Sequence, residues 1–146
     1  MALVVHPTIQ NTPKEYVELV YHDEKNSIYL GNKEACKPDI YDAIISIIDP
    51  DIEFQPIQQN HFIFRIYDHS ASNIKPVLQH FIECITQLNG SVLVHCGEGI
   101  SRSPTLLIGY FIQEKGFSYN DAFDLLQRAQ PNIKPNRGFN KFLKSL

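Results

Sequence analysis

The sequence predicts an α/β domain with a mostly parallel central sheet that is flanked by helices on both faces. Apolar runs at residues 43–48 and 91–95 are short, nearly continuous and bounded by turn residues, as in strands buried on both faces. Between and after these runs, apolar residues recur at intervals of three and four, which indicates helices. Strands that alternate with helices favour parallel pairing through crossover connections. A chain of 146 residues is long enough to bury the core of one such domain.

The first part of the chain predicts an arm followed by short strands. Residues 1–15 are mostly polar after the first apolar stretch and contain two prolines, which predicts an arm without regular structure. Residues 16–21 and 27–31 are strand candidates, and the polar tetrad between them indicates a hairpin turn. A short helix is expected over 32–37, and Pro38 should end it.

The middle of the chain predicts a strand and then an amphipathic helix. Residues 62–66 form the strand candidate, which ends in a polar loop. The helix that follows should be capped by Ser72 or Asn73, and Asn89-Gly90 should end it before the strand at 91–95.

Three helices are expected after the strand at 91–95. The first covers 103–115, with Ser103 as its N-cap, and it is apolar nearly all round, so it should be central and buried. The second helix opens at a capping box that starts at Ser118. This helix ends before Pro131. A last short helix is expected over 136–145.

Composition excludes several classes of protein. The net charge of −3 gives no electrostatic footprint for nucleic acid. No apolar run approaches the ~20 residues that span a bilayer, and no lipid-anchor motif occurs, so membrane insertion is not expected. Three widely spaced cysteines indicate free thiols in a reducing compartment, hence a cytoplasmic protein with the nucleus as a second possibility. No cofactor and no metal are expected, and a monomer is favoured.

The residues between the strand at 91–95 and the next helix indicate an anion-binding loop. Small residues let successive N–H groups point into one concavity at a helix N-terminus, which suits a phosphate. Arg102 adds a planar fork for two phosphate oxygens, and the same environment favours the thiolate of Cys96, the expected nucleophile. His95 should orient the loop and add positive character, or it could be a structural histidine with no effect on Cys96. In either role its imidazole is expected to bond to the backbone. The expected substrate-binding residues are Gly97, Glu98, Gly99, Ile100, Ser101 and Arg102.

This string resembles a known signature. His-Cys-x5-Arg-Ser is similar to the motif of the cysteine-based protein tyrosine phosphatases. The longer run His-Cys-x-Glu-Gly-x-Ser-Arg-Ser-Pro-Thr resembles the small, atypical dual-specificity phosphatases. Residues 28–32 and 128–139 also resemble that family, so the likeness extends over roughly 16–145. It implies one catalytic domain over 16–146 behind the arm at 1–15.

The resemblance also implies catalytic roles outside the loop. The general acid should follow a strand upstream of the nucleophile, which favours Asp68 over Asp49, Asp51 and Glu53. Asp68 could instead cap the next helix, or do both. Ser103 resembles the hydroxyl that donates to the cysteine sulfur, and its alternative role is the N-cap of its own helix.

Loop composition bears on the substrate. Glu98 and the lack of lysine argue against a polyanionic phosphoinositide. The compact members of the family that this chain resembles lack the loops that deepen the cleft, so the resemblance implies a shallow cleft that admits phosphoserine and phosphothreonine as well as phosphotyrosine. The alternatives are a phosphoprotein-binding module with little turnover and a phosphatase of phosphoinositides or RNA 5′ ends. An arsenate reductase or a rhodanese-type sulfur transferase matches a shorter string.

The other cysteines and histidines have simpler interpretations. Cys36 and Cys84 are expected to be inert thiols, with Cys84 in the core. His61, His69 and His80 are expected on the surface or in loops, and His69 could touch the substrate because it adjoins the proposed acid.

Overall fold

The computed structural model describes residues 14–146, so almost all of the expected arm lies outside the described residues. Five strands form one sheet in the order β1-β2-β5-β3-β4. The strands are β1 (Val17–His22), β2 (Asn26–Gly31), β3 (Ala43–Ile48), β4 (His61–Arg65) and β5 (Gly90–His95). The helices are η1 (Lys33–Ala35), α2 (Ile74–Thr86), α3 (Arg102–Lys115), α4 (Tyr119–Ala129) and α5 (Arg137–Lys144). Within the described part of the chain, no helix has the length and apolarity to cross a membrane.

The predicted α/β class is confirmed, and the sheet is mostly parallel. Strand β5 lies between β2 and β3 and is parallel to both, β3 is parallel to β4, and only the β1–β2 hairpin is antiparallel. A central parallel strand is covered on both faces and is therefore apolar along its length. All six residues of β3 are buried, as the continuous apolar run predicted.

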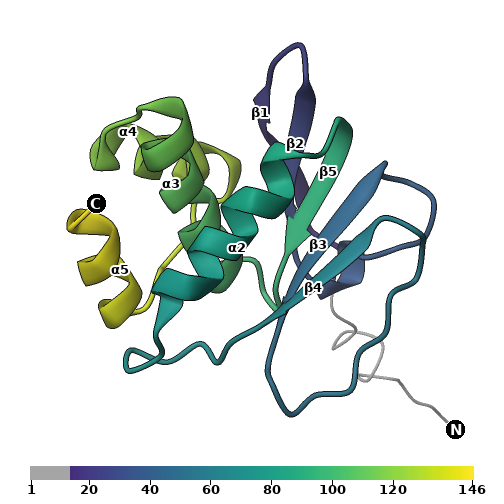
Figure 1. Cartoon of the computed structure of the whole chain (residues 1–146), viewed down its shortest axis with the longest axis horizontal. Helices are drawn as coiled ribbons and strands as arrows, with labels where there is room; N and C mark the ends of the chain where they lie inside the picture. Colours follow the sequence, from purple (N-terminus) through teal and green to yellow (C-terminus); the bar gives the residue numbers. More distant parts are fainter. Residues whose placement is uncertain (1–13) are drawn as a thin grey trace, which may run out of the picture.

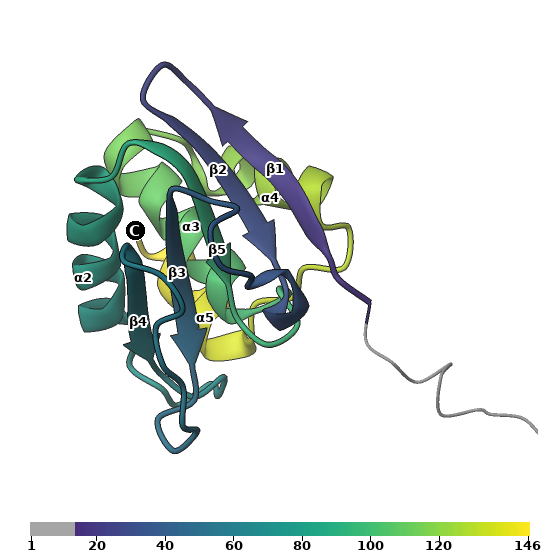
Figure 2. The same cartoon turned by 90° about the vertical axis from the view of Figure 1, so that its right-hand side faces the viewer.

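Helices lie on both faces of the sheet, as predicted, but they are divided unequally between the two faces. In Figures 1 and 2, α2, α3, α4 and α5 all lie on the same side of the sheet. Their apolar faces and the sheet form the main core, in which Phe81, Phe111 and Phe139 are fully buried. The opposite face is covered by η1 and the chain around it, through a small cluster of Ala35, Ile44 and Leu93. The connection from β2 to β3 holds one short 3₁₀ turn, η1, which covers that face.

Element boundaries differ from the predictions at two helix ends. Helix α2 ends at Thr86, earlier than predicted, and Gly90 instead belongs to β5, where it takes the left-handed conformation (φ 91°). Asn73 caps the start of α2, as one of the two predicted caps, by accepting a hydrogen bond from the Lys75 amide. Helix α3 begins at Arg102 with Ser101 in the N-cap position, so the prediction of Ser103 as the N-cap is wrong.

Candidate active site

The segment between β5 and α3 lies where a central parallel strand meets the N-terminus of a buried helix. Helix α3 packs on the sheet with Leu106, Leu107 and Ile108 fully buried, so its first turn is held firmly. The N-terminus of a helix carries free N–H groups and a partial positive charge. The loop that connects the two elements therefore lies in an electrostatic field that favours an anion.

The carbonyl groups of this loop are bonded away from its concave side. The Cys96 carbonyl accepts from His95 Nδ1 at 3.1 Å, and the Gly97 carbonyl accepts from the Lys33 amide at 3.0 Å. Two further bonds hold the end of the loop, from Lys134 N to Ile100 O at 2.6 Å and from Thr105 N to Ser101 O at 3.0 Å. These four bonds join the loop to β5, η1, α3 and the segment before α5.

The amide groups of the loop have no such partners. Within residues 14–146, no acceptor takes a hydrogen bond from the amides of 97–101. Gly99 supports this arrangement, since it has φ 76° and a Cβ there would lie 2.7 Å from the Gly31 carbonyl oxygen. Unpartnered amides in sequence form an anion-binding nest.

The nest opens into a small hollow. Its volume is about 100 Å³, roughly three times the ~30 Å³ that one water molecule occupies in the liquid. Its lining residues are Asp68, Cys96, Gly97, Glu98, Ile100, Ser101 and Arg102. The fold thus brings the expected nucleophile, the expected acid and the guanidinium to one cavity.

The hydroxyl of Ser103 lies against the sulfur of Cys96. Ser103 Oγ is 3.2 Å from Cys96 Sγ, and Ser103 is fully buried in the first turn of α3. Because Ser103 does not cap this helix, the alternative role left open by the sequence is removed. Its hydroxyl can donate a hydrogen bond to a thiolate.

Arg102 is oriented by a residue that sequence reasoning set aside. Its Nη1 donates to the Ile66 carbonyl at 3.0 Å and forms an ion pair with Asp49. Asp49 directly follows β3, the strand beside β5, so the sheet places this carboxylate at the same edge as the loop. The only sequence signal was that Asp49 follows a buried strand. The sequence alone offers Asp49 only as a poorer candidate for the general acid, whereas the structure shows it as the partner of the arginine.

Asp68 is held at the hollow by two donors. Its Oδ1 accepts from Ser101 Oγ at 2.7 Å and from Asn136 Nδ2 at 2.8 Å. Asn73, and not Asp68, caps helix α2. Asn136, the N-cap of α5, was not foreseen as a site residue, because 68 positions separate it from Asp68 in the sequence.

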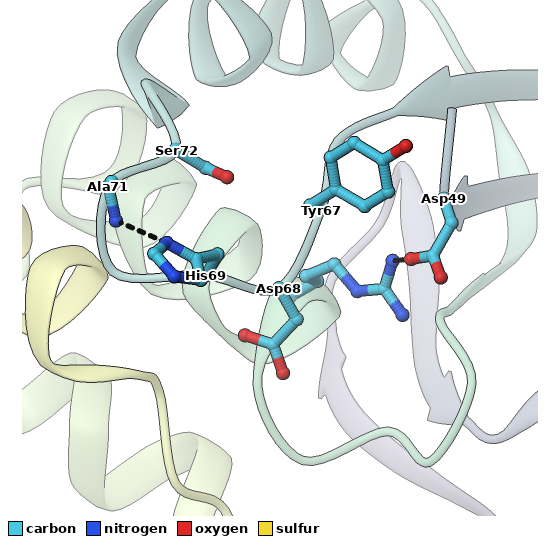
Figure 3. Close-up of a pocket in the computed structure, with 7 residues that line it drawn as sticks. Asp49, Tyr67, Asp68, His69, Ala71 and Ser72 are labelled. Atoms are coloured by element: carbon cyan, nitrogen blue, oxygen red, sulfur yellow. Dashed lines mark hydrogen bonds and ion pairs between the residues drawn. The ribbon is translucent and has the colours of Figure 1, made fainter. Parts of the chain in front are cut away.

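A second cavity adjoins the hollow. Its volume is about 520 Å³, and Asp68 and Arg102 line both this cavity and the hollow. Figure 3 shows Asp49, Tyr67, Asp68 and His69 around it, with Ala71 and Ser72 at the start of the next turn. His69 therefore lies beside the proposed acid, as its position in the sequence suggested. The cavity gives room for residues that flank a bound phosphate ester.

The histidines differ most from expectation. His95 is fully buried, and burial lowers its pKa to about 4, so the expected positive character is wrong. His61 is buried as well, not on the surface, and burial lowers its pKa too. Ser46 Oγ joins the two rings, at 2.7 Å from His61 Nε2 and 2.6 Å from His95 Nε2.

The remaining thiols lie in a different environment from Cys96. Burial raises the pKa of the Cys84 thiol to about 11, and burial also raises the pKa of Cys36. A raised thiol pKa keeps the sulfur protonated and unreactive at neutral pH. Both observations agree with the prediction of inert side chains.

Comparison with known proteins identifies similar catalytic domains. The family profile described as "Dual specificity phosphatase, catalytic domain" matches residues 28–146. Dual specificity protein phosphatase 15 of Mus musculus is 33% identical over 126 residues, which cover 80% of this chain and 53% of that protein. Dual specificity protein phosphatase 5 of Homo sapiens is 44% identical over 59 residues, 40% of this chain and 15% of that protein. The chain therefore spans about half or less of these relatives.

Solved structures show the same fold. The crystal structure of DUSP15 has a TM-score of 0.70 at 25% identity and covers 81% of both chains. The human tyrosine phosphatase-like serine/threonine/tyrosine-interacting protein has a TM-score of 0.67 at 28% identity, with 81% of this chain and 89% of that chain covered.

Proposed function

The chain belongs to the dual specificity phosphatase family, and from this premise we propose that it removes phosphate from phosphotyrosine, phosphoserine and phosphothreonine of proteins through a phosphocysteine intermediate. The observation that carries the proposal is the hollow in which Cys96 lies among unpartnered amides and beside Arg102. Such a hollow binds a phosphate dianion and presents a sulfur to its phosphorus atom.

The first step is attack in line with the leaving oxygen. The Cys96 thiolate forms a sulfur–phosphorus bond while the bond from phosphorus to the side-chain oxygen breaks. Asp68 gives its proton to that oxygen, so the substrate leaves as a neutral hydroxyl. Arg102 and the loop amides stabilise the charge on the three equatorial oxygens.

The second step returns the thiolate. Asp68, now ionised, takes a proton from water while the water oxygen attacks phosphorus and the sulfur–phosphorus bond breaks. Ser103 donates a hydrogen bond to the departing sulfur from its position 3.2 Å away. Inorganic phosphate then leaves the hollow, and the enzyme is restored with Asp68 protonated.

Charge and shape favour a phosphorylated protein side chain as the substrate. Glu98 at the hollow repels ligands that carry several phosphate groups. The hollow is small, while the adjoining cavity admits neighbouring residues of a polypeptide. Phosphotyrosine is expected to react faster, because a phenolate is a better leaving group than an alkoxide. A catalytic free thiol suits a reducing compartment, so we place the protein in the cytoplasm or nucleus.

The test is a substrate panel assayed in the presence of a chelator. The purified chain should hydrolyse p-nitrophenyl phosphate and phosphopeptides, prefer them to phosphoinositides, and be inhibited by vanadate. Cys96→Ser should lose all turnover but still bind phosphopeptides, whereas Cys84→Ser serves as the matched control and should keep activity. Binding by the wild type without turnover would instead make the chain a phosphoprotein-binding module. Preference for phosphoinositides or RNA 5′ ends would move the substrate to the alternative class.

A further inference from the structure

Two buried histidines and a serine lie together on the sheet face away from α2–α5. Strand register explains the cluster, since Ser46 pairs with His95 across β3 and β5, and Ile44 pairs with His61 across β3 and β4. Side chains alternate between faces along a strand, so Ile44 and Ser46 share one face. Ser46 and His95 are fully buried, and the Phe54 ring packs on both imidazoles with centroids 5.6 and 6.2 Å away.

The hydrogen bonds of this cluster have one consistent direction. The Ile57 amide can only donate, and it donates to His61 Nδ1 at 3.0 Å. A neutral His61 therefore carries its proton on Nε2 and donates it to Ser46 Oγ. At the far end, the Cys96 carbonyl can only accept, so His95 carries its proton on Nδ1. His95 Nε2 is then an acceptor and receives the Ser46 hydroxyl proton.

We propose that Ser46 and His61 are positioning residues for the phosphate loop, acting through His95 on the peptide between Cys96 and Gly97. This inference rests on the proposed function. The Cys96 carbonyl and the Gly97 amide belong to one planar trans peptide, so they point in opposite directions. When His95 holds the carbonyl on its side, the Gly97 N–H faces the hollow that Gly97 lines. A flipped peptide would put a carbonyl oxygen toward the phosphate instead.

The relay begins in a part of the chain far from the nucleophile in sequence. Ile57 belongs to the segment between β3 and β4, and its side chain is 39% exposed. The segment between β3 and β4 also supplies Phe54, whose ring covers the two imidazoles. The geometry thus links the surface segment at 49–60 to the peptide that follows the nucleophile.

The same cluster has a competing interpretation as a metal site. The ligand atoms of Cys36, His61 and His95 lie within 4.8 Å of one another. A metal needs the lone pair of the ring nitrogen that faces it, yet the Ile57 bond puts the His61 proton on Nε2. Ser46 Oγ already occupies the space between the two Nε2 atoms. The hydrogen-bond relay accounts for the contacts of both histidines without a metal.

The first experiment compares two serine variants by steady-state kinetics on a phosphotyrosine peptide. Ser46→Ala should lower kcat on the order of tenfold, as a small misplacement of reacting groups does, with less change in KM. Ser27→Ala is the matched control, because Ser27 also bonds a histidine, His22 Nδ1 at 2.8 Å, but on the exposed β1–β2 hairpin. It should match wild type in both constants. Equal kcat in Ser46→Ala and wild type would overturn the proposal.

His61 variants provide a second test should Ser46→Ala fail to fold. His61→Gln keeps an N–H donor for Ser46 and should keep kcat near that of the wild type. His61→Leu removes the donor and should lower kcat. A loss of kcat that is equal in both variants would assign His61 a packing role only and overturn its part in the relay.

A third readout does not depend on activity. Long-range ¹H–¹⁵N spectra should show His61 as the Nε2–H tautomer and His95 as the Nδ1–H tautomer at pH 7. The opposite tautomer at either ring, or a zinc-induced shift of both that is lost in Cys36→Ser, would overturn the relay. If the wild type has the expected tautomers but no phosphatase activity, the relay is supported and the proposed function is contradicted.

Discussion

The two faces of the sheet use the same strands for different purposes. Toward α2–α5, the strands contribute Val92, Val94 and Ile45 to the main apolar core. Toward the other face, β5 and β3 present His95 and Ser46, which bond to each other, and His95 also bonds to the phosphate loop. Burial of apolar area on one face stabilises the fold, whereas directional bonds on the other face orient the loop.

This difference predicts which substitutions should change stability and which should change catalytic activity. A residue of the helix face acts through packing, so its loss should lower the free energy of unfolding without changing kcat of the folded fraction. A residue of the loop edge acts through position or charge, so its loss should change kcat first. The predictions below test that separation, beginning with the largest effect.

The largest effect is expected at Asp68, at the edge of the sheet. Asp68→Asn should lower kcat about 10²- to 10⁴-fold on a phosphoserine peptide, whose leaving group needs a proton. The loss on p-nitrophenyl phosphate should be much smaller, because p-nitrophenolate leaves without one. Thermal unfolding should change little. Equal losses on both substrates would assign the acid to another residue.

Phe81 tests the helix face, where it is fully buried in α2. Phe81→Ala should lower the free energy of unfolding by about 3–5 kcal/mol, through lost contacts and the cavity left behind. Urea unfolding measures this change, and active-site titration of the folded fraction should return a kcat like that of the wild type. A large fall in kcat per folded molecule would mean that the two faces are not separable.

Acidic pH should lower the free energy of unfolding through His95, which lies on the sheet face away from α2–α5. Burial lowers its folded pKa to about 4 from the ordinary 6.5, so the unfolded state binds the proton more readily. Its contribution is therefore fully present above pH 6.5 and is lost as the pH falls toward 4, by up to about 3 kcal/mol. Urea unfolding at several pH values gives the free energy of unfolding of the wild type and of His95→Asn. Between pH 6.5 and 4 this free energy should fall less steeply with pH in the variant than in the wild type. Parallel curves would exclude His95 as the source.

The smallest effect is expected at Asp49, the partially exposed partner of Arg102. Asp49→Asn should raise KM or lower kcat by about tenfold or less, because the Ile66 carbonyl still holds the guanidinium at 3.0 Å. The loss should shrink at high salt, where the wild-type ion pair is screened. Asp124→Asn on α4, remote from the loop, is the control and should match wild type. A salt-independent loss would point to a shape effect instead of a charge effect.

Much of the fold followed from the sequence because its signals are local. The run at 43–48 became β3 without a shift, and the Ser118 box caps α4 by accepting from the Asp121 amide. Errors arose where one residue could serve two elements. The sequence predicts Gly90 at a helix end, but this residue starts β5. It predicts His61 on the surface or in a loop, but this residue begins β4 and is buried.

For the site, the sequence by itself determined the loop between Cys96 and Arg102, because a nest of successive amides needs only neighbouring residues. It also pointed to Asp68 and Ser103, each with two open roles. Only the tertiary structure decided which group touches which, in the pairs Arg102–Asp49, Asp68–Asn136 and His61–Ser46–His95. These partners lie far apart in the chain and meet through sheet register and helix placement. Strand register is set only when the strands pack into the sheet, so it cannot be inferred from the order of residues alone.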